Sequence, residues 1–149
     1  MDIQIRTFSE LNTDQLYEIL QLRAAVFIVE QDCVYQDIDG KDPIAAHVLA
    51  YKQNQLVAYT RIFKAGDYAH NASIGRVLVS IDHRKKAYGK AIMKASIAAI
   101  ETHFNSTLIE ISAQTYLLDF YESLGFYPEG ESYLEDGIPH IKMLRTSSI

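Results

Sequence analysis

The sequence predicts an α/β (α+β) fold in which helices cover both faces of a mixed sheet. The first observation is periodicity: apolar residues alternate as in strands in some stretches and recur at helical spacing in others. The second is the resulting order, which is strand, helix, three strands, helix, strand, helix and two strands. The third is composition: 149 residues with 48% hydrophobic and 22% charged residues suit one compact domain, expected over residues 1–149.

The chain begins with an expected strand and helix. Ile3, Ile5 and Thr7 alternate with polar neighbours, as in a half-buried strand. Asn12, followed three residues later by Gln15, resembles a capping box that starts a helix. The apolar residues that follow recur at helical spacing and are expected on one stripe: Leu16, Ile19, Leu20 and Phe27.

A loop, a hairpin and a further strand are expected next. Residues 32–46 are rich in aspartate and contain glycine and proline, which predicts a loop. Val48–Tyr51 and Leu56–Phe63 flank a polar turn and predict a hairpin. After a second loop over residues 65–72, the apolar run Ile74–Val79 predicts a buried strand.

The C-terminal half alternates helices and strands. Tyr88–Phe104 carries apolar residues at helical spacing, and Thr107–Ser112 alternates as a strand. Tyr116–Leu124 predicts a short helix that ends at Gly125. Two final strands and the turn between them are expected over Glu131–Leu134, His140–Leu144 and Asp136–Gly137.

Charge and cysteine content narrow the function classes. A net charge of -5 and a pI near 5.5 argue against nucleic-acid binding. Cys33 is the only cysteine, so no internal disulfide or thiolate zinc cluster is expected, and no metal site is predicted. The first ten residues lack the apolar core of a signal peptide, and no segment approaches the ~20 apolar residues of a membrane span. A cytoplasmic protein without membrane contact is therefore expected.

A basic turn stands between the strand Ile74–Val79 and the helix that follows. Such a turn can direct backbone N–H groups and the positive end of a helix dipole at a diphosphate. A solvated run of charge is the alternative. The residues of the turn are Arg84, Lys85, Lys86, Ala87, Tyr88, Gly89 and Lys90.

This turn and the segment Phe120–Phe126 resemble the coenzyme A loop and the tyrosine helix of the GCN5-related N-acetyltransferases (GNAT). The turn follows the family pattern of Arg or Gln, two variable residues, Gly, one variable residue, then Gly or Ala, except that Ala87 replaces the first glycine. Because a β-carbon narrows the permitted φ, the interpretation requires Ala87 at negative φ. Phe120–Phe126 matches the family motif Phe-Tyr-x-x-x-Gly-Phe.

The resemblance implies the GNAT fold, with a mostly antiparallel sheet of about six to seven strands, and acetyl-CoA as cosubstrate. It places the diphosphate at the turn and the pantetheine arm along the backbone of Val77, Leu78 and Val79. It also implies that Tyr121 acts as a general acid that protonates the leaving thiolate, which suits a phenol that stays protonated at neutral pH. A core tyrosine is the alternative.

Further segments resemble the ElaA-type acyltransferases of this superfamily, whose loops tend to lack the first glycine. The likeness spans nearly the whole chain and implies N-acetyltransferase activity. The segments are 22–31, 35–42, 74–77, 113–114 and 135–141.

The acceptor is expected to be a small amine or a protein amine. Carboxylates crowd the segment from Glu30 to Asp42, and an acidic rim would attract a cation, although a solvated acidic loop is equally consistent. An ammonium must lose a proton before attack, and Glu30, Glu110 and His140 are candidate bases, none of which is assigned. The competing functions are a non-catalytic acyl-CoA-binding sensor or interaction module and, more weakly, a generic nucleotide-phosphate loop.

Overall fold

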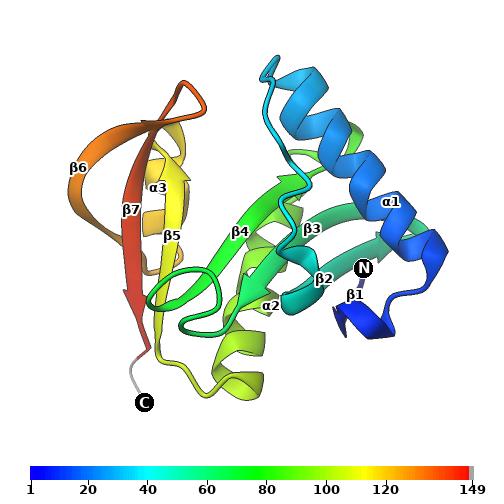
Figure 1. The fold of residues 1–149 in the computed structure, drawn as a ribbon, viewed down its shortest axis with the longest axis horizontal. Coiled ribbons are helices and arrows are strands. Elements are labelled where there is room, and N and C mark those ends of the chain that lie inside the picture. Colours follow the sequence, from blue (N-terminus) through cyan, green and yellow to red (C-terminus); the bar gives the residue numbers. More distant parts are fainter. Residues whose placement is uncertain (148–149) are drawn as a thin grey trace.

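The computed structural model describes residues 1–147 and contains a seven-stranded sheet with the order β1-β2-β3-β4-β5-β7-β6 (Figure 1). The strands are β1 (Asp2–Thr7), β2 (Ala46–Lys52), β3 (Gln55–Phe63), β4 (Ala72–Val79), β5 (Leu108–Gln114), β6 (Tyr127–Glu135) and β7 (Ile138–Thr146). The helices are α1 (Thr13–Arg23), α2 (Tyr88–His103) and α3 (Leu118–Glu122). Neighbouring strands are antiparallel except β4 and β5, which are parallel. The predicted fold class and element order are confirmed.

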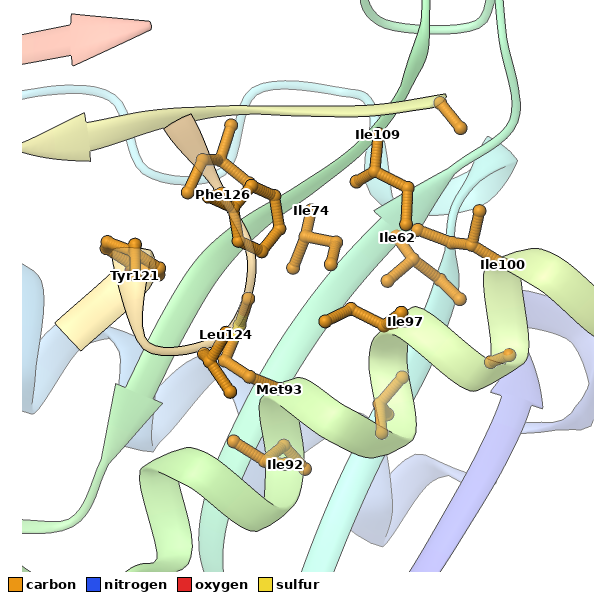
Figure 2. Close-up of a cluster of buried hydrophobic side chains, with 14 of the residues drawn as sticks. Ile62, Ile74, Ile92, Met93, Ile97, Ile100, Ile109, Tyr121, Leu124 and Phe126 are labelled. Carbon is orange, nitrogen blue, oxygen red and sulfur yellow. The ribbon is translucent and has the colours of Figure 1, made fainter. Parts of the chain in front are cut away.

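Helices pack on both faces of the sheet, with α1 in front and α2 behind in Figure 1. On one face Ile92, Met93 and Ile97 of α2 lie against Ile74 of β4 and Phe126 (Figure 2). A fully buried aliphatic or aromatic side chain contributes about 1.5–3 kcal/mol, so this layer holds α2 firmly. The opposite face buries Ile19 of α1 with Leu49 of β2 and Tyr59 of β3. Within residues 1–147, no helix is both long enough and apolar enough to cross a membrane.

Helix α1 starts as predicted but does not continue unchanged to Phe27. The Asn12 side chain accepts the Gln15 N–H at 2.8 Å, and the Gln15 side chain accepts the Asn12 N–H at 3.1 Å. After Arg23 the chain widens into a π-helix, η2 (Ala24–Glu30). The extra residue per turn re-aims the side chains that follow, so the expected single stripe is interrupted there, and Val26 and Phe27 are buried from the wider turn.

A cleft opens where β4 and β5 separate. The two strands pair only at Ala72 with Ile109 and Ser73 with Glu110, and then diverge along their lengths (Figure 1). Strand β4 is also irregular against β3, where the register shifts beside Arg76, whose φ is +50°. A bulge of this kind bends a strand and redirects its backbone groups. The second half of β4 therefore has an edge that β5 does not cover.

Candidate active site

The cleft between β4 and β5 continues into a cavity of about 790 Å³. Its walls come from η2, the second half of β4, the basic turn, the start of α2, β5, α3 and the hairpin of β6 and β7. The structure thus brings together almost every residue that the sequence singled out. Those that line the cavity are Glu30, Val77, Leu78, Val79, Arg84, Lys85, Ala87, Tyr88, Gly89, Lys90, Tyr121 and His140, whereas Lys86 is exposed outside the lining.

The basic turn adopts a left-handed conformation at two residues. Ala87 has a φ of +60° and Lys85 a φ of +66°. The prediction that Ala87 sits at negative φ is wrong. A left-handed residue other than glycine costs about 1–2 kcal/mol, and the helix that follows compensates, because the Ala87 carbonyl accepts the Ala91 N–H at 3.1 Å as the first hydrogen bond of α2. The turn delivers the N-terminus of α2 to the cavity.

Charge at this end of the cavity is mostly positive. Arg84 donates to both Glu30 oxygens, at 2.5 and 2.7 Å, and its Nε donates to the Val79 carbonyl at 3.1 Å. These hydrogen bonds from Arg84 lower the pKa of Glu30 below its ordinary value, so Glu30 is ionised and already engaged. Neither Lys85 nor Lys90 pairs with a carboxylate among residues 1–147. Two cationic side chains are therefore available to an anion.

Tyr121 projects from α3 into the same cavity. Its ring contacts Phe120 and Phe126 edge-on, with centroid distances of 5.2 and 6.1 Å. Burial, with a smaller contribution from Tyr116, raises the pKa of Tyr121 to about 12, so the phenol keeps its proton at neutral pH. The hydrogen bonds formed within residues 1–147 do not include the Tyr121 hydroxyl. Tyr121 thus lines the cavity with an O–H that no group of the described chain occupies.

The acidic segment before β2 does not form the expected rim. Three of its four aspartates pair with three arginines: Arg23 with Asp37 and Asp42, Arg61 with Asp39 and Asp42, and Arg76 with Asp37 and Asp39. Asp37 and Asp42 are buried, as are Arg23 and Arg61. The acidic-rim and solvated-loop interpretations are both wrong for these residues, because arginines from distant elements neutralise the carboxylates.

The arginine nitrogens and aspartate oxygens of this ion-pair network lie close together. Arg23 Nη1 lies 2.7 Å from Asp42 Oδ1, and Arg61 Nη1 donates to the same oxygen at 2.9 Å. Burial alone would raise the pKa of Asp42, but the hydrogen bonds and charges of Arg23 and Arg61 outweigh it, and the pKa is lowered. Arg76 Nε lies 2.8 Å from Asp37 Oδ1 with its N–H aimed elsewhere, so this contact is an ion pair without a hydrogen bond. The network fastens the loop before β2 onto the sheet.

A polar cluster surrounds His140, which the sequence named as a candidate base, but the sequence predicted no role for its neighbours Glu135, Ser112 and Tyr133. His140 of β7 is 6% exposed, and its Nε2 lies 3.3 Å from Glu135 Oε2. Ser112 of β5 donates to Glu135 Oε1 at 3.3 Å, and the Tyr133 ring stacks on His140 with 6.3 Å between centroids. The signal was present, because the Asp136–Gly137 turn fixes the register that sets Tyr133 opposite His140.

The three candidate bases have different surroundings. Glu30 is paired with Arg84. Glu110 lies outside the cavity lining, and its Oε1 accepts the backbone and side-chain N–H groups of Asn71, both at 3.2 Å. Only His140 among these three both lines the cavity and lacks an arginine partner.

Comparisons with known proteins agree with this geometry. The family model described as an acetyltransferase (GNAT) domain matches residues 9–147. The chain is 47% identical over 139 residues to Protein ElaA of Escherichia coli strain K12, covering 92% of this chain and 91% of that protein. The crystal structure of Escherichia coli ElaA superimposes with a TM-score of 0.90 at 44% identity, covering 97% of this chain and 98% of the other.

Two further solved structures share the fold. An acyl-CoA N-acyltransferase from Pseudomonas aeruginosa superimposes with a TM-score of 0.92 at 37% identity, covering 98% of this chain and 100% of the other. An aminoglycoside 6'-N-acetyltransferase crystallised with coenzyme A superimposes with a TM-score of 0.75 over 98% of this chain and 97% of the other. Its identity of 15% supports likeness of fold alone. The predicted ElaA-type resemblance is confirmed by the first set of matches.

Proposed function

The chain belongs to the acetyltransferase (GNAT) family, and we propose that it transfers an acetyl group from acetyl-CoA to a primary amine. The observation that carries the proposal is the juxtaposition in one cavity of a cationic helix N-terminus and the free hydroxyl of Tyr121. The first suits the diphosphate of the coenzyme and the second suits the sulfur of its thioester.

The coenzyme arm fits the uncovered edge of β4. Because β5 leaves β4 after Ser73, the backbone from Val77 to Val79 can pair with the amides of a pantetheine arm. Backbone N–H groups at the start of α2, together with Lys85 and Lys90, would bind the diphosphate. In this proposal Arg84, held by Glu30, keeps the turn against η2 beside the phosphates.

Tyr121 would act when the thioester breaks. The amine lone pair attacks the thioester carbonyl carbon, and the carbon–sulfur bond breaks with its electron pair on sulfur. The Tyr121 O–H then donates its proton to the thiolate, which makes CoA a better leaving group. The raised pKa of about 12 supports a phenol that is fully protonated before this step.

The test is transfer by the purified protein, measured as release of the CoA thiol with acetyl-CoA and a panel of amines. We expect turnover with at least one amine, and a kcat about 10²–10⁴-fold lower in Tyr121→Phe with an unchanged Kd for acetyl-CoA. Tyr127→Phe is the control, since Tyr127 is exposed on β6 outside the cavity lining. Acetyl-CoA binding without turnover on any amine would support the non-catalytic module, and full activity of Tyr121→Phe would make Tyr121 a core residue.

A further inference from the structure

The cavity carries opposite charge on two of its walls. Lys85 and Lys90 belong to the wall proposed for the diphosphate. Glu135 and Asp136, at the hairpin of β6 and β7, line a different wall, and arginine contacts none of the carboxylates there among residues 1–147. Asp37, Asp39 and Asp42 are neutralised by arginines, and Glu30 in the cavity lining is paired with Arg84. A cationic group in the cavity would therefore find carboxylates without an arginine partner at this hairpin.

His140 is held in a defined orientation beside Glu135. Its Nδ1 lies 2.7 Å from the Ile138 carbonyl oxygen, and this oxygen can only accept, so Nδ1 carries a hydrogen. In the neutral ring the second nitrogen, Nε2, then carries the free lone pair, and it lies 3.3 Å from Glu135 Oε2. Ser112 holds the other carboxylate oxygen. The His140 lone pair and a carboxylate of fixed direction therefore lie side by side at the cavity wall.

Resting on the proposed function, we propose that Glu135 and His140 bind an aliphatic ammonium and take its proton, so that the acceptor is a primary amine charged in solution. Half of the Glu135 side chain is exposed, which leaves it room to contact a ligand, whereas His140 is buried at the cavity wall. Both come from adjacent strands whose register is fixed by a tight turn. The site is preformed rather than assembled by the acceptor.

Each proton has a destination in this scheme. The ammonium gives one proton to His140 Nε2, and the resulting imidazolium lies against the Glu135 carboxylate. The freed lone pair forms the carbon–nitrogen bond, the carbon–sulfur bond breaks, and Tyr121 protonates the sulfur. The nitrogen then loses a second proton, which replaces the one that Tyr121 gave up, by way of water. His140 finally releases its proton through the half-exposed Glu135 to solvent.

Groups from several elements lie near His140 at the cavity wall. Besides Glu135, strand β6 contributes the stacked Tyr133 ring, and the turn before α3 contributes Tyr116 at the cavity wall. Strand β5 contributes the neutral Ser112 and Gln114. Within residues 1–147, Glu135 is therefore the carboxylate that lies within ion-pairing distance of the His140 ring.

The experiment compares Glu135→Gln and His140→Gln with Glu131→Gln, a control that removes the same charge from an exposed residue of the same strand. Acceptor KM, kcat and the Kd for acetyl-CoA are measured with a small alkyl diamine and, separately, with a lysine-containing peptide. We expect Glu135→Gln to raise acceptor KM about tenfold, as the loss of a charged hydrogen bond would, and the control and the coenzyme Kd to stay unchanged. The acceptor with the lower KM in the parent protein, either the diamine or the peptide, shows whether a free amine or a peptide amine supplies the ammonium.

Varying the basicity of the acceptor amine distinguishes the loss of a base from general structural damage. We expect His140→Gln to lower kcat about 10²–10⁴-fold with a strongly basic amine and far less with an amine that is already neutral at the assay pH. Parent-like acceptor KM in Glu135→Gln together with an equal loss for both amines in His140→Gln would overturn the inference, while transfer by the parent would leave the proposed function standing. If His140→Gln does not fold, the acceptor KM of Glu135→Gln alone decides whether the inference stands. Absence of transfer by the parent would overturn both proposals.

Discussion

The molecule has two acidic groups, the aspartates of the loop before β2 and the carboxylates of the β6–β7 hairpin, and they differ in what surrounds them. Asp37, Asp39 and Asp42 are the denser group along the chain, yet arginines from α1, β3 and β4 neutralise them. Glu135 stands on the β6–β7 hairpin, for which the sequence predicted a turn and a candidate base but no role for this carboxylate, and it lines the cavity with His140 as its partner. The comparison teaches that the charge of a segment does not predict its role, because partners from remote elements decide which carboxylates remain available.

The largest expected effect is a loss of stability when the ion-pair network of Asp37, Asp39 and Asp42 is disrupted. Arg23 is fully buried between Asp37 and Asp42, so Arg23→Met deprives each of these buried carboxylates of one of its two arginine partners. We expect a loss of about 3–5 kcal/mol in the free energy of unfolding, measured by urea titration. Arg84→Met is the matched control, because its pair with Glu30 is part-exposed on both sides, and such pairs contribute about 0–1 kcal/mol. Equal losses in the two variants would contradict a structural role for the network.

A second prediction separates the two groups by kinetics. Asp39→Asn removes charge from the network, and we expect acceptor KM to stay within about twofold of the parent, since that carboxylate is committed to Arg61. Glu135→Gln should move acceptor KM several times further. A rise of acceptor KM in Asp39→Asn that shrinks with added salt would return the acidic segment to the role of an acceptor rim.

Lowering the pH should reduce the free energy of unfolding through the ion-pair network of Asp37, Asp39 and Asp42. Asp39 and Asp42 would have their pKa raised by burial, but hydrogen bonds from Arg61 and Arg23 outweigh burial and lower it. A folded-state pKa below the unfolded value of about 3.9 contributes stability that is present above that value and is lost as pH falls through the folded pKa. We expect the free energy of unfolding to fall steeply below about pH 4, and less steeply in Asp39→Asn. An identical slope in both proteins would contradict the assignment.

The smallest expected effect concerns the basic turn. Ala87→Gly relieves the left-handed strain but adds freedom to the unfolded chain, so a net gain below about 1 kcal/mol is expected in thermal unfolding. Ala98→Gly, at an exposed position inside α2, should instead lose about 1 kcal/mol. Equal losses at both positions would contradict the left-handed conformation of Ala87.

Local signals explain what could be predicted from the sequence. The capping box at Asn12, the Asp136–Gly137 turn and the apolar stripe of α2 each depend on a few neighbouring residues, and each has the predicted structure. The basic turn and Tyr121 were found through motifs, and both line the cavity. Their roles in binding and catalysis stay predictions.

The features that escaped prediction depend on contacts between distant segments. The π-helix follows a buried arginine whose partners lie in the next loop, and the ion-pair network needs Arg61 and Arg76 from two other strands. The left-handed Ala87 is compensated by the first hydrogen bond of α2, which no local propensity reveals. Glu135 becomes a site residue only when β5 and β7 place Ser112 and His140 beside it.

Calorimetric titration of CoA into two variants of Gly89 tests the central claim, coenzyme binding in this cavity, most directly. A β-carbon at Gly89 would meet Phe120 Cζ at 3.6 Å and Val79 Cγ2 at 3.7 Å, which are ordinary contacts, so Gly89→Ala fits and serves as the control. Gly89→Asp adds a negative charge at the proposed diphosphate site, where repulsion should weaken CoA binding by about tenfold or more. We predict parent-like affinity for Gly89→Ala and an affinity for Gly89→Asp that is lower by about tenfold or more. Equal affinity of the two variants would contradict the account and move the coenzyme elsewhere.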